Sequence, residues 1–371
     1  MTANPLVRLG ALGQSPWLDY ITRDLLQTGE LQRLIGEDGL RGMTTNPTIF
    51  EKAVAGSDRY DADIRSLADS GLKPGEIFEA LAVADVRAAC DMFLAIYKST
   101  DGGDGFVSIE VSPELAADTE GTVREARRLW EAVDRPNVMI KIPGTPEGLP
   151  AITRCLARGI NVNVTLLFSV ERHRQVMEAY LTALEQRRSR REPINRLASV
   201  ASFFVSRVDT RLDPVLDKHG DPAARGLRGT IAIANALVAY DAFQQVFRGP
   251  RWDALAREGA RVQRPLWAST STKDPAFPDT HYVEPLVAPD TVNTLPPDTF
   301  AAYRDHGRPA VRFAEGMPKA KERLETLARL GIKLEEVTQA LETEGVQKFT
   351  ASYATLLHGV GQKAMALSGA S

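Results

Sequence analysis

Residues 137–168 read NVMIKIPGTPEGLPAITRCLARGINVNVTLLF and alternate between two kinds of apolar pattern. The stretches 137–143 and 160–168 are short, rich in β-branched residues and bounded by proline, glycine or polar residues, which is typical of buried strands. Between them, residues 148–159 place apolar side chains at helical spacing. A strand, a helix and another strand in this order predict two parallel strands joined by a helical crossover.

The same alternation extends over most of the chain. Helix-like segments such as 75–97 separate further strand-like stretches at 16–21, 40–46, 105–111, 197–205, 264–270 and 281–287. Eight such units predict an α/β fold, a closed (β/α)8 barrel of the TIM type. We predict a single domain over 1–371, with barrel strands at about 16–290 and a C-terminal helical extension at about 291–371 that closes and covers the barrel.

An open, doubly wound sheet is the alternative fold. Such a sheet usually begins with a glycine-rich turn that leads from a strand into a helix. The nearest glycine-rich stretch, DGGDG at 101–105, precedes a strand-like stretch and is not followed by a Lys-Ser or Lys-Thr pair. We therefore interpret it as a plain turn and favour the barrel.

The composition excludes several classes of protein. The 371 residues carry a formal net charge of −3, so the chain has no general attraction to nucleic acid or to an anionic membrane. No apolar run approaches the roughly 18 residues of a membrane span, and the N-terminus lacks the apolar core of a signal peptide. Cys90 and Cys155 form no C-x-x-C pattern, which argues against a zinc site and a disulfide framework. A cytoplasmic location fits these features.

Polar residues occur near the carboxyl ends of almost all the predicted strands: Asp19, Asn46, Glu110, Lys141, Asn163, Thr165, Ser202 and Ser269. Any one of them alone is readily explained as a loop or capping residue, or as a side chain in solvent. In a parallel barrel, however, these strand ends converge on one face, where barrel enzymes form their active sites. The set as a whole therefore predicts one polar cavity in an otherwise apolar interior.

Lys141 is the residue in this set that determines the chemistry. The histidines show no paired metal-ligand spacing, and none lies at the carboxyl end of a strand, so neither a metal site nor a Ser-His-Asp triad is predicted. A lysine amine is a nucleophile only when unprotonated, and a dry pocket can lower the pKa of a catalytic lysine from about 10.4 to about 7–8. Because an anion stabilises an ammonium group, we expect Asp19 and Glu110 to lie several ångströms away or to act through water.

A neutral lysine adds to a ketone to give a carbinolamine and then an iminium. The iminium withdraws electrons from the neighbouring carbon–carbon bond, which can then break or form. Two proton movements accompany these steps, one at a substrate hydroxyl and one at the carbinolamine. Two carboxylates on different strands match these two tasks.

The chain resembles the transaldolases, which are class I aldolase-like enzymes of the pentose phosphate pathway. The resemblance covers about residues 17–290 and depends on five segments: GMTTNPTIF (42–50), VSIEV (107–111), MIKIPGT (139–145), NVNVTLLFS (161–169) and SFFVSRV (202–208). It implies that Lys141 forms a Schiff base and that Asp19 takes and returns the proton of the C4 hydroxyl. It also implies that Glu110 and Thr165 hold the water used to make and break the carbinolamine.

The resemblance further implies a set of substrate-binding residues. Asn46, Asn163 and Ser202 would hold the dihydroxyacetone unit, Arg207 would bind the sugar phosphate, and Phe204 would help to keep the site dry. The family shows a second arginine after the serine of the seventh strand, but WASTSTKDP (267–275) has none. We predict that Lys273, Ser269 and the hydroxyls around them replace it as phosphate ligands. The alternative is that Lys273 is an ordinary loop residue.

The reaction implied by the resemblance moves dihydroxyacetone from sedoheptulose 7-phosphate to glyceraldehyde 3-phosphate, giving erythrose 4-phosphate and fructose 6-phosphate. It needs no dissociable cofactor, and the implied partners are phosphorylated sugars and a second copy of the chain in a homodimer. Two alternatives remain. One is a fructose 6-phosphate aldolase-type lyase with the same lysine chemistry, and the other is a non-catalytic barrel that binds a sugar phosphate.

Overall fold

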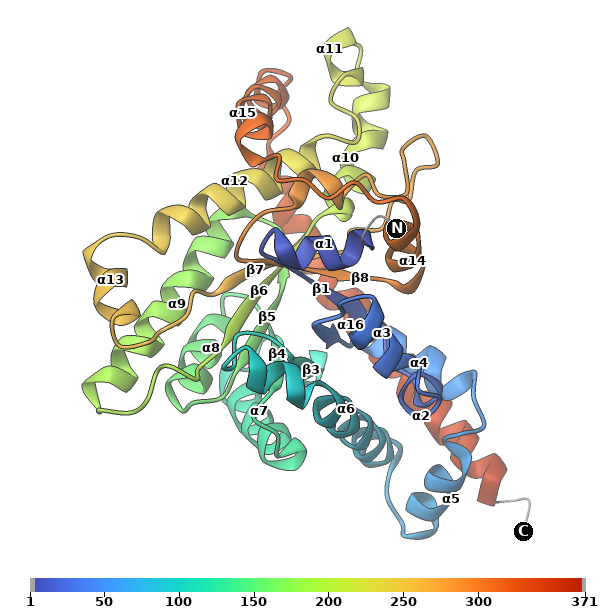
Figure 1. Ribbon diagram of the computed structural model, residues 1–371. Helices are drawn as coiled ribbons and strands as arrows, with labels where there is room; N and C mark the ends of the chain where they lie inside the picture. Colours follow the sequence, from blue (N-terminus) through green and yellow to red (C-terminus); the bar gives the residue numbers. More distant parts are fainter. Residues whose placement is uncertain (1–3, 369–371) are drawn as a thin grey trace.

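Eight parallel strands form a closed barrel in chain order in the computed structural model, which describes residues 4–368. The strands are β1 (Gln14–Asp19), β2 (Gly42–Thr44), β3 (Val107–Glu110), β4 (Val138–Pro143), β5 (Val162–Leu167), β6 (Ser199–Phe204), β7 (Arg264–Ala268) and β8 (Thr291–Leu295). Helices surround the strands (Figure 1). The predicted (β/α)8 fold is thereby confirmed. The assignment of the whole chain to one domain stays a prediction.

One helix, α1 (Pro5–Ala11), precedes β1. The helices between the strands are mostly amphipathic and bury one face toward the interior. In chain order they are α2 (Arg23–Gln27), α3 (Glu30–Glu37), α4 (Pro47–Ala55), α5 (Asp61–Asp69), α6 (Pro74–Ser99), η1 (Pro113–Leu115), α7 (Thr119–Val133), α8 (Gly148–Ala157), α9 (Val170–Ser189), α10 (Ser206–Lys218), α11 (Pro222–Arg225), α12 (Ile231–Val246), α13 (Pro250–Ala256) and η2 (Glu284–Leu286).

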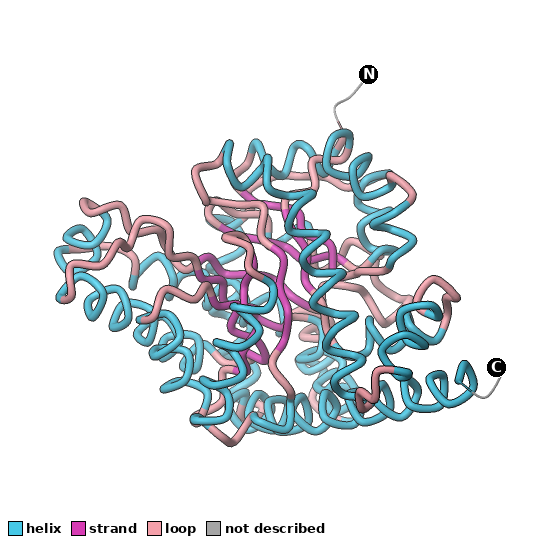
Figure 2. The backbone as a smooth tube through the Cα atoms, turned by 90° about the horizontal axis from the view of Figure 1, so that it is seen from below, coloured by secondary structure: helices cyan, strands magenta, loops and turns pink. Residues whose placement is uncertain are grey.

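Three helices follow the last strand: α14 (Pro297–His306), α15 (Phe313–Arg329) and α16 (Leu334–Ser368). The long helix α16 packs on α4, α5, α6 and α10 and also touches β5. Figure 2 shows it running past one end of the strands toward the C-terminus. The expectation that the C-terminal helices cover the barrel is correct for α16.

The eighth strand is not where the sequence pattern placed it. The stretch 281–287 contains η2, which packs between α12 and α15, and β8 follows at Thr291–Leu295, just beyond the predicted limit of about 290. The apolar residues of 281–287 are buried because this loop is covered by helices, and its Pro285 cannot donate to a sheet ladder. The hydropathy pattern did not predict β8, because three of the five residues in its sequence, TVNTL, are polar. Its polar side chains bond to neighbours in the barrel: the Thr270 hydroxyl donates to Asn293 Oδ1 at 3.0 Å.

The register of the strands positions the site. Glu110 pairs with Lys141, and Lys141 pairs with Asn163, so these three residues of β3, β4 and β5 lie side by side at one level of the barrel. Asp19 pairs with Thr44 where β1 meets β2. The carboxyl ends of the strands therefore bring the predicted polar residues together, as a parallel barrel requires.

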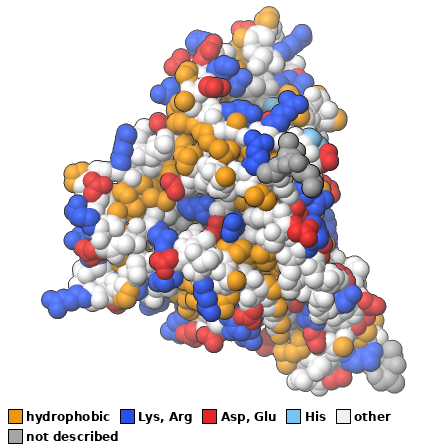
Figure 3. All heavy atoms as spheres, viewed as in Figure 1, with side chains coloured by type: hydrophobic (Ala, Val, Ile, Leu, Met, Phe, Trp, Pro, Cys, Tyr) orange, Lys and Arg blue, Asp and Glu red, His pale blue; other side chains and the backbone are white. Residues whose placement is uncertain are grey.

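The outer surface carries mixed charge. On the face seen in Figure 3, acidic and basic side chains are interspersed without an extended patch of one sign. No helix among residues 4–368 is long and apolar enough to cross a membrane.

Candidate active site

Lys141 points into the barrel rather than into solvent. Its side chain is only 6% exposed, and its Nζ donates to the Thr45 carbonyl oxygen at 3.0 Å and to Glu110 Oε2 at 3.2 Å. The strand therefore holds the amine at a buried position where it touches one carboxylate and one carbonyl. A buried amine in this setting is available for chemistry on a bound molecule.

The direct contact with Glu110 contradicts our expectation that the carboxylates would keep their distance from Lys141. The contact follows from the register, since the two residues lie side by side on β3 and β4. Burial raises the pKa of Glu110 above its ordinary value of 4.5, against the lowering effects of the Lys141 charge and hydrogen bond. A carboxyl with a raised pKa can accept the proton of the amine and later return it.

Asp19 agrees better with the expectation that the carboxylates lie away from Lys141. The two side chains interact through their charges, but no hydrogen bond joins them. The Thr44 hydroxyl donates to Asp19 Oδ1 at 2.6 Å and shares a second 2.6 Å hydrogen bond with the Thr294 hydroxyl. Asp19 keeps some surface open to a cavity, but its carboxyl lies deep in the barrel mouth. Burial raises its pKa above the ordinary 3.8, although Lys141 and Thr44 both act to lower it.

A cavity of about 750 Å³ opens at this end of the barrel. The predicted site residues that line it come from six strands or the segments after them, and they are Asp19, Asn46, Lys141, Thr165, Ser202, Phe204, Arg207, Ser269 and Lys273. The prediction of one shared polar cavity therefore holds for six of the eight strand-end residues, whereas Glu110 and Asn163 lie outside its lining.

Asn163 is fully buried and has partners for both ends of its amide. It accepts a hydrogen bond from the Ser202 hydroxyl at 2.7 Å, and its Nδ2 donates to Ser108 Oγ at 3.0 Å. In this arrangement Asn163 orients Ser202 instead of facing the cavity. The side-chain oxygen of Asn46 accepts from the Ile49 N–H at 3.0 Å and caps α4, which leaves its amide nitrogen to donate to a ligand.

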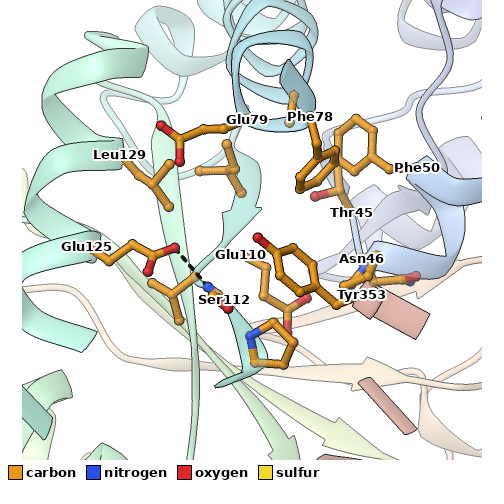
Figure 4. A pocket seen from close by; sticks show the side chains of 15 residues that line it. Thr45, Asn46, Phe50, Phe78, Glu79, Glu110, Ser112, Glu125, Leu129 and Tyr353 are labelled. Carbon is orange, nitrogen blue, oxygen red and sulfur yellow. Dashed lines mark hydrogen bonds between the residues drawn. The ribbon is translucent and has the colours of Figure 1, made fainter. Parts of the chain in front are cut away.

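Two polar atoms in the site are buried without a hydrogen-bond partner, Glu110 Oε1 and Thr165 Oγ1. Buried polar atoms normally have a partner, and a water molecule can provide it. Glu110 also lines a second cavity of about 30 Å³, which is large enough for one water. Figure 4 shows Glu110 and Tyr353 at this cavity, and Glu125 accepting a hydrogen bond from the Ser112 N–H.

The loop after β7 brings only part of its hydroxyl cluster to the cavity. Ser269 and Ser271 line it, together with Lys273. Thr270 and Thr272 face elsewhere and donate to Asn293 Oδ1 and to the Pro278 carbonyl oxygen. This narrows the predicted cluster to two hydroxyls and one ammonium. Ser269 has a left-handed backbone (φ 55°), a costly conformation for a residue other than glycine and one that is common at functional sites.

Several cations around the cavity were not singled out from the sequence. Lys52 of α4, Arg211 of α10 and Lys348 of α16 line it besides Arg207 and Lys273, while Asp19 and Glu344 are the acidic residues in its lining. This excess of positive charge favours an anionic ligand. No local motif marks such residues, because they lie on helices whose position over the barrel depends on the complete fold.

Arg207 is the cation best placed to bind an anion. Its guanidinium carbon lies 5.7 Å from the centre of the Phe204 ring, and it is half-buried. Burial lowers its pKa, and no carboxylate of the described chain contributes to that shift. A partly buried guanidinium without an anionic partner is well suited to a phosphate.

Comparison with known proteins is consistent with this site. The profile of the family Transaldolase/Fructose-6-phosphate aldolase matches residues 16–360. The chain belongs to this family. A transaldolase of Acidothermus cellulolyticus is 53% identical over 96% of this chain and 96% of its own length. Transaldolases of Thermobifida fusca (50%) and Frankia alni (49%) each match 97% of this chain and 98% of their own.

Membership of the transaldolase/fructose-6-phosphate aldolase family confirms the resemblance drawn from the sequence segments, and it makes this chain an enzyme. The family match spans the barrel and most of α16. Membership alone does not assign a role to each site residue.

The raised pKa of Asp19 predicts a pH-dependent effect on stability. Because the folded state holds this proton more tightly than the unfolded state, the stabilisation is present below the unfolded pKa near 3.8. It is lost as the pH rises through the raised folded-state value. We expect the difference in Tm between Asp19→Asn and the wild type to increase from pH 4 to pH 8. The exposed Asp69 provides the control, since Asp69→Asn should show no such trend. A constant difference for Asp19→Asn would contradict the raised pKa.

Proposed function

We propose that this chain is a transaldolase that transfers a dihydroxyacetone unit from sedoheptulose 7-phosphate to glyceraldehyde 3-phosphate through a Schiff base on Lys141. The observation that supports this most directly is the buried Lys141 amine in contact with the buried Glu110 carboxylate, beside a cavity lined by several cations. The amine supplies the nucleophile, and the cations supply a place for the phosphate.

The first half of the reaction uses Glu110. Glu110 Oε2 takes a proton from the Lys141 ammonium over the 3.2 Å contact, and the neutral amine attacks the C2 carbonyl of the donor ketose. The protonated Glu110 then gives its proton to the carbinolamine hydroxyl, which leaves as water and produces the iminium. Glu110 Oε1 and Thr165 Oγ1 are both buried without a partner, and the family resemblance assigns that water to these two residues.

The second half uses Asp19. Its carboxylate removes the proton of the C4 hydroxyl, the C3–C4 bond breaks, and the electron pair of that bond moves to C3 and the iminium to give an enamine. The aldehyde fragment leaves, and glyceraldehyde 3-phosphate takes its place. Attack of the enamine carbon on the new carbonyl returns the proton from Asp19, and hydrolysis of the iminium releases fructose 6-phosphate.

Reductive trapping tests this proposal. Borohydride added with fructose 6-phosphate should reduce the iminium and attach the three-carbon unit or the ketose irreversibly to Lys141. Peptide mapping should then find the added mass on the peptide that contains position 141. An unmodified peptide in a preparation with normal turnover would refute the Schiff-base mechanism.

A lyase of the fructose 6-phosphate aldolase type is the second candidate, since the matching family includes that activity in its description. The two functions differ in what happens to the three-carbon unit. Dihydroxyacetone measured with and without an acceptor aldehyde distinguishes them, because a transferase releases little in either case. Phe204, which lines the cavity, supports transfer because it keeps polar groups and water from that wall.

Arg207 should bind the phosphate of both substrates. We expect Arg207→Ala to raise KM for fructose 6-phosphate by about ten- to a hundredfold, the effect of losing a charged hydrogen bond. KM for an acceptor without a phosphate, such as glyceraldehyde, should change little. Lys273→Ala should have a smaller effect of the same kind if Lys273 is a second ligand. Equal losses with phosphorylated and unphosphorylated substrates would exclude the phosphate role of Arg207.

The homodimer and the cytoplasmic location are part of the same proposal. Both rest on the family resemblance and on the composition of the chain. Size-exclusion chromatography with light scattering measures the oligomeric state directly.

A further inference from the structure

One face of α16 forms a wall of the active-site cavity. The residues of α16 that line the cavity follow helical spacing, and they are Leu341, Glu344, Lys348 and Phe349. Phe349 is 8% exposed, and the centre of its ring lies 5.6 Å from Lys141 Nζ. The helix therefore places an aromatic ring against the amine proposed to form the Schiff base.

The position of α16 is fixed by close packing and by polar contacts. Gly345 has no side chain where a Cβ would come within 3.0 Å of the Leu166 side chain at the end of β5. Arg172 of α9 and Glu342 form a mostly buried ion pair with Nε and Oε2 3.2 Å apart. Farther along the helix, Lys363 Nζ donates to the carbonyl oxygens of Val54 and Ser57 at 2.9 and 2.6 Å. These contacts hold Phe349 in place over the site.

The ring complements the other contacts of the amine. Thr45 and Glu110 accept hydrogen bonds from Lys141 Nζ, whereas Phe349 covers the amine without offering a hydrogen-bond partner. A cation within about 6 Å of an aromatic ring is attracted to its face. This attraction persists after Schiff-base formation, because the iminium nitrogen is also cationic. The same ring occupies space from which water could reach the adduct.

Water is the competitor of the acceptor aldehyde. After cleavage, the enamine either attacks an aldehyde or is protonated at carbon by water to give an iminium. Addition of water to that iminium then releases free dihydroxyacetone and regenerates the amine. Excluding water from a closed site suppresses such side reactions. Any side chain that keeps the Lys141 adduct dry therefore favours transfer over release.

We propose that Phe349 shields the Lys141 adduct from water and thereby sets the ratio of transfer to release. This proposal rests on the proposed Schiff-base function. It assigns to the C-terminal helix a determinant of reaction specificity, in addition to Phe204 of β6, which contacts Phe168 and Arg207 at the cavity wall.

The test compares dihydroxyacetone released with product transferred, at a fixed concentration of fructose 6-phosphate and of an acceptor aldehyde. We expect Phe349→Ala and Phe349→Gln to raise this ratio several-fold, and Phe349→Leu, which keeps an apolar side chain, to stay close to the wild type. Leu356→Ala is the matched control. Leu356 is buried on the same helix, 1% exposed, and lines neither the large nor the small cavity.

The outcomes separate the two proposals. A ratio that rises in both polar or small variants at position 349 but not in Leu356→Ala supports the shielding role. An unchanged ratio in a folded variant that borohydride still traps at Lys141 would overturn it, as would an equal rise in Leu356→Ala. Failure to trap the wild-type protein would instead refute the Schiff-base function itself.

Discussion

Lys141→Met should abolish turnover and leave a folded barrel. The amine forms and breaks the covalent bond to the ketose, and among residues 4–368 no second lysine touches Glu110 to replace it. We expect kcat/KM to fall on the order of 10⁵-fold or more, as for the removal of other catalytic nucleophiles. Methionine is apolar, has a similar length, and suits a side chain that is only 6% exposed. Circular dichroism and thermal melting should therefore show a native fold.

Lys52→Met is the control for Lys141→Met, because Lys52 lines the same cavity from α4 without a contact to the carboxylates of the site. It should retain kcat and change KM only modestly. The alternative of a non-catalytic sugar-phosphate barrel, which family membership already argues against, would predict that function survives Lys141→Met. Appreciable turnover by a folded Lys141→Met protein would refute the proposed mechanism.

The sequence was sufficient to predict the barrel because a parallel sheet covered by helices requires apolar strands on both faces. Seven strands lie in stretches that the sequence pattern identified, and their carboxyl ends mark the site. In β8 only Val292 and Leu295 are apolar, and Thr291 and Asn293 are fully buried polar residues. Such a strand is stable only when neighbouring strands supply hydrogen-bond partners. Its hydropathy alone could not distinguish it from the covered loop at 281–287.

The contact between Lys141 and Glu110 was missed for a different reason. We expected the carboxylates at a distance, because an anion close to an ammonium group holds its proton. The register of β3 and β4 makes the two residues neighbours, and burial penalises the charged form of the Glu110 carboxyl. The pair can therefore share a proton. The sequence order predicted that β3 and β4 are neighbouring parallel strands. It did not predict which residues of the two strands lie opposite each other.

The residues of α16 illustrate a limit of sequence periodicity. Phe349 fits the apolar stripe of a long helix. The spacing of a stripe shows that a helix covers something apolar, but it does not show what is covered. Here the surface covered by α16 includes the Lys141 amine. Phe349, whose spacing is that of an ordinary core residue, therefore lies in the active site.

Asp19→Ala should separate the two chemical steps. Lys141 and Glu110 remain intact, so the Schiff base should still form and borohydride should still trap it. Cleavage of the C3–C4 bond then lacks its base, and we expect turnover to fall by about 10²–10⁴-fold, the usual effect of losing a general acid–base group. A rapid-quench measurement of trapped adduct beside steady-state turnover records both steps in the same preparation.

Glu110→Gln is the counterpart of Asp19→Ala, because it removes the group that exchanges protons with the amine over 3.2 Å. It should slow the appearance of the trapped adduct, whereas Asp19→Ala should let the adduct accumulate. The raised pKa of both carboxyls suits each to donate and accept a proton, so geometry has to separate them: Glu110 accepts a hydrogen bond from Lys141, and Asp19 accepts one from Thr44 on the adjacent strand β2. If Asp19→Ala slows adduct formation and cleavage equally, Asp19 is not the base for C3–C4 cleavage, and the division of labour between the two carboxyls is wrong.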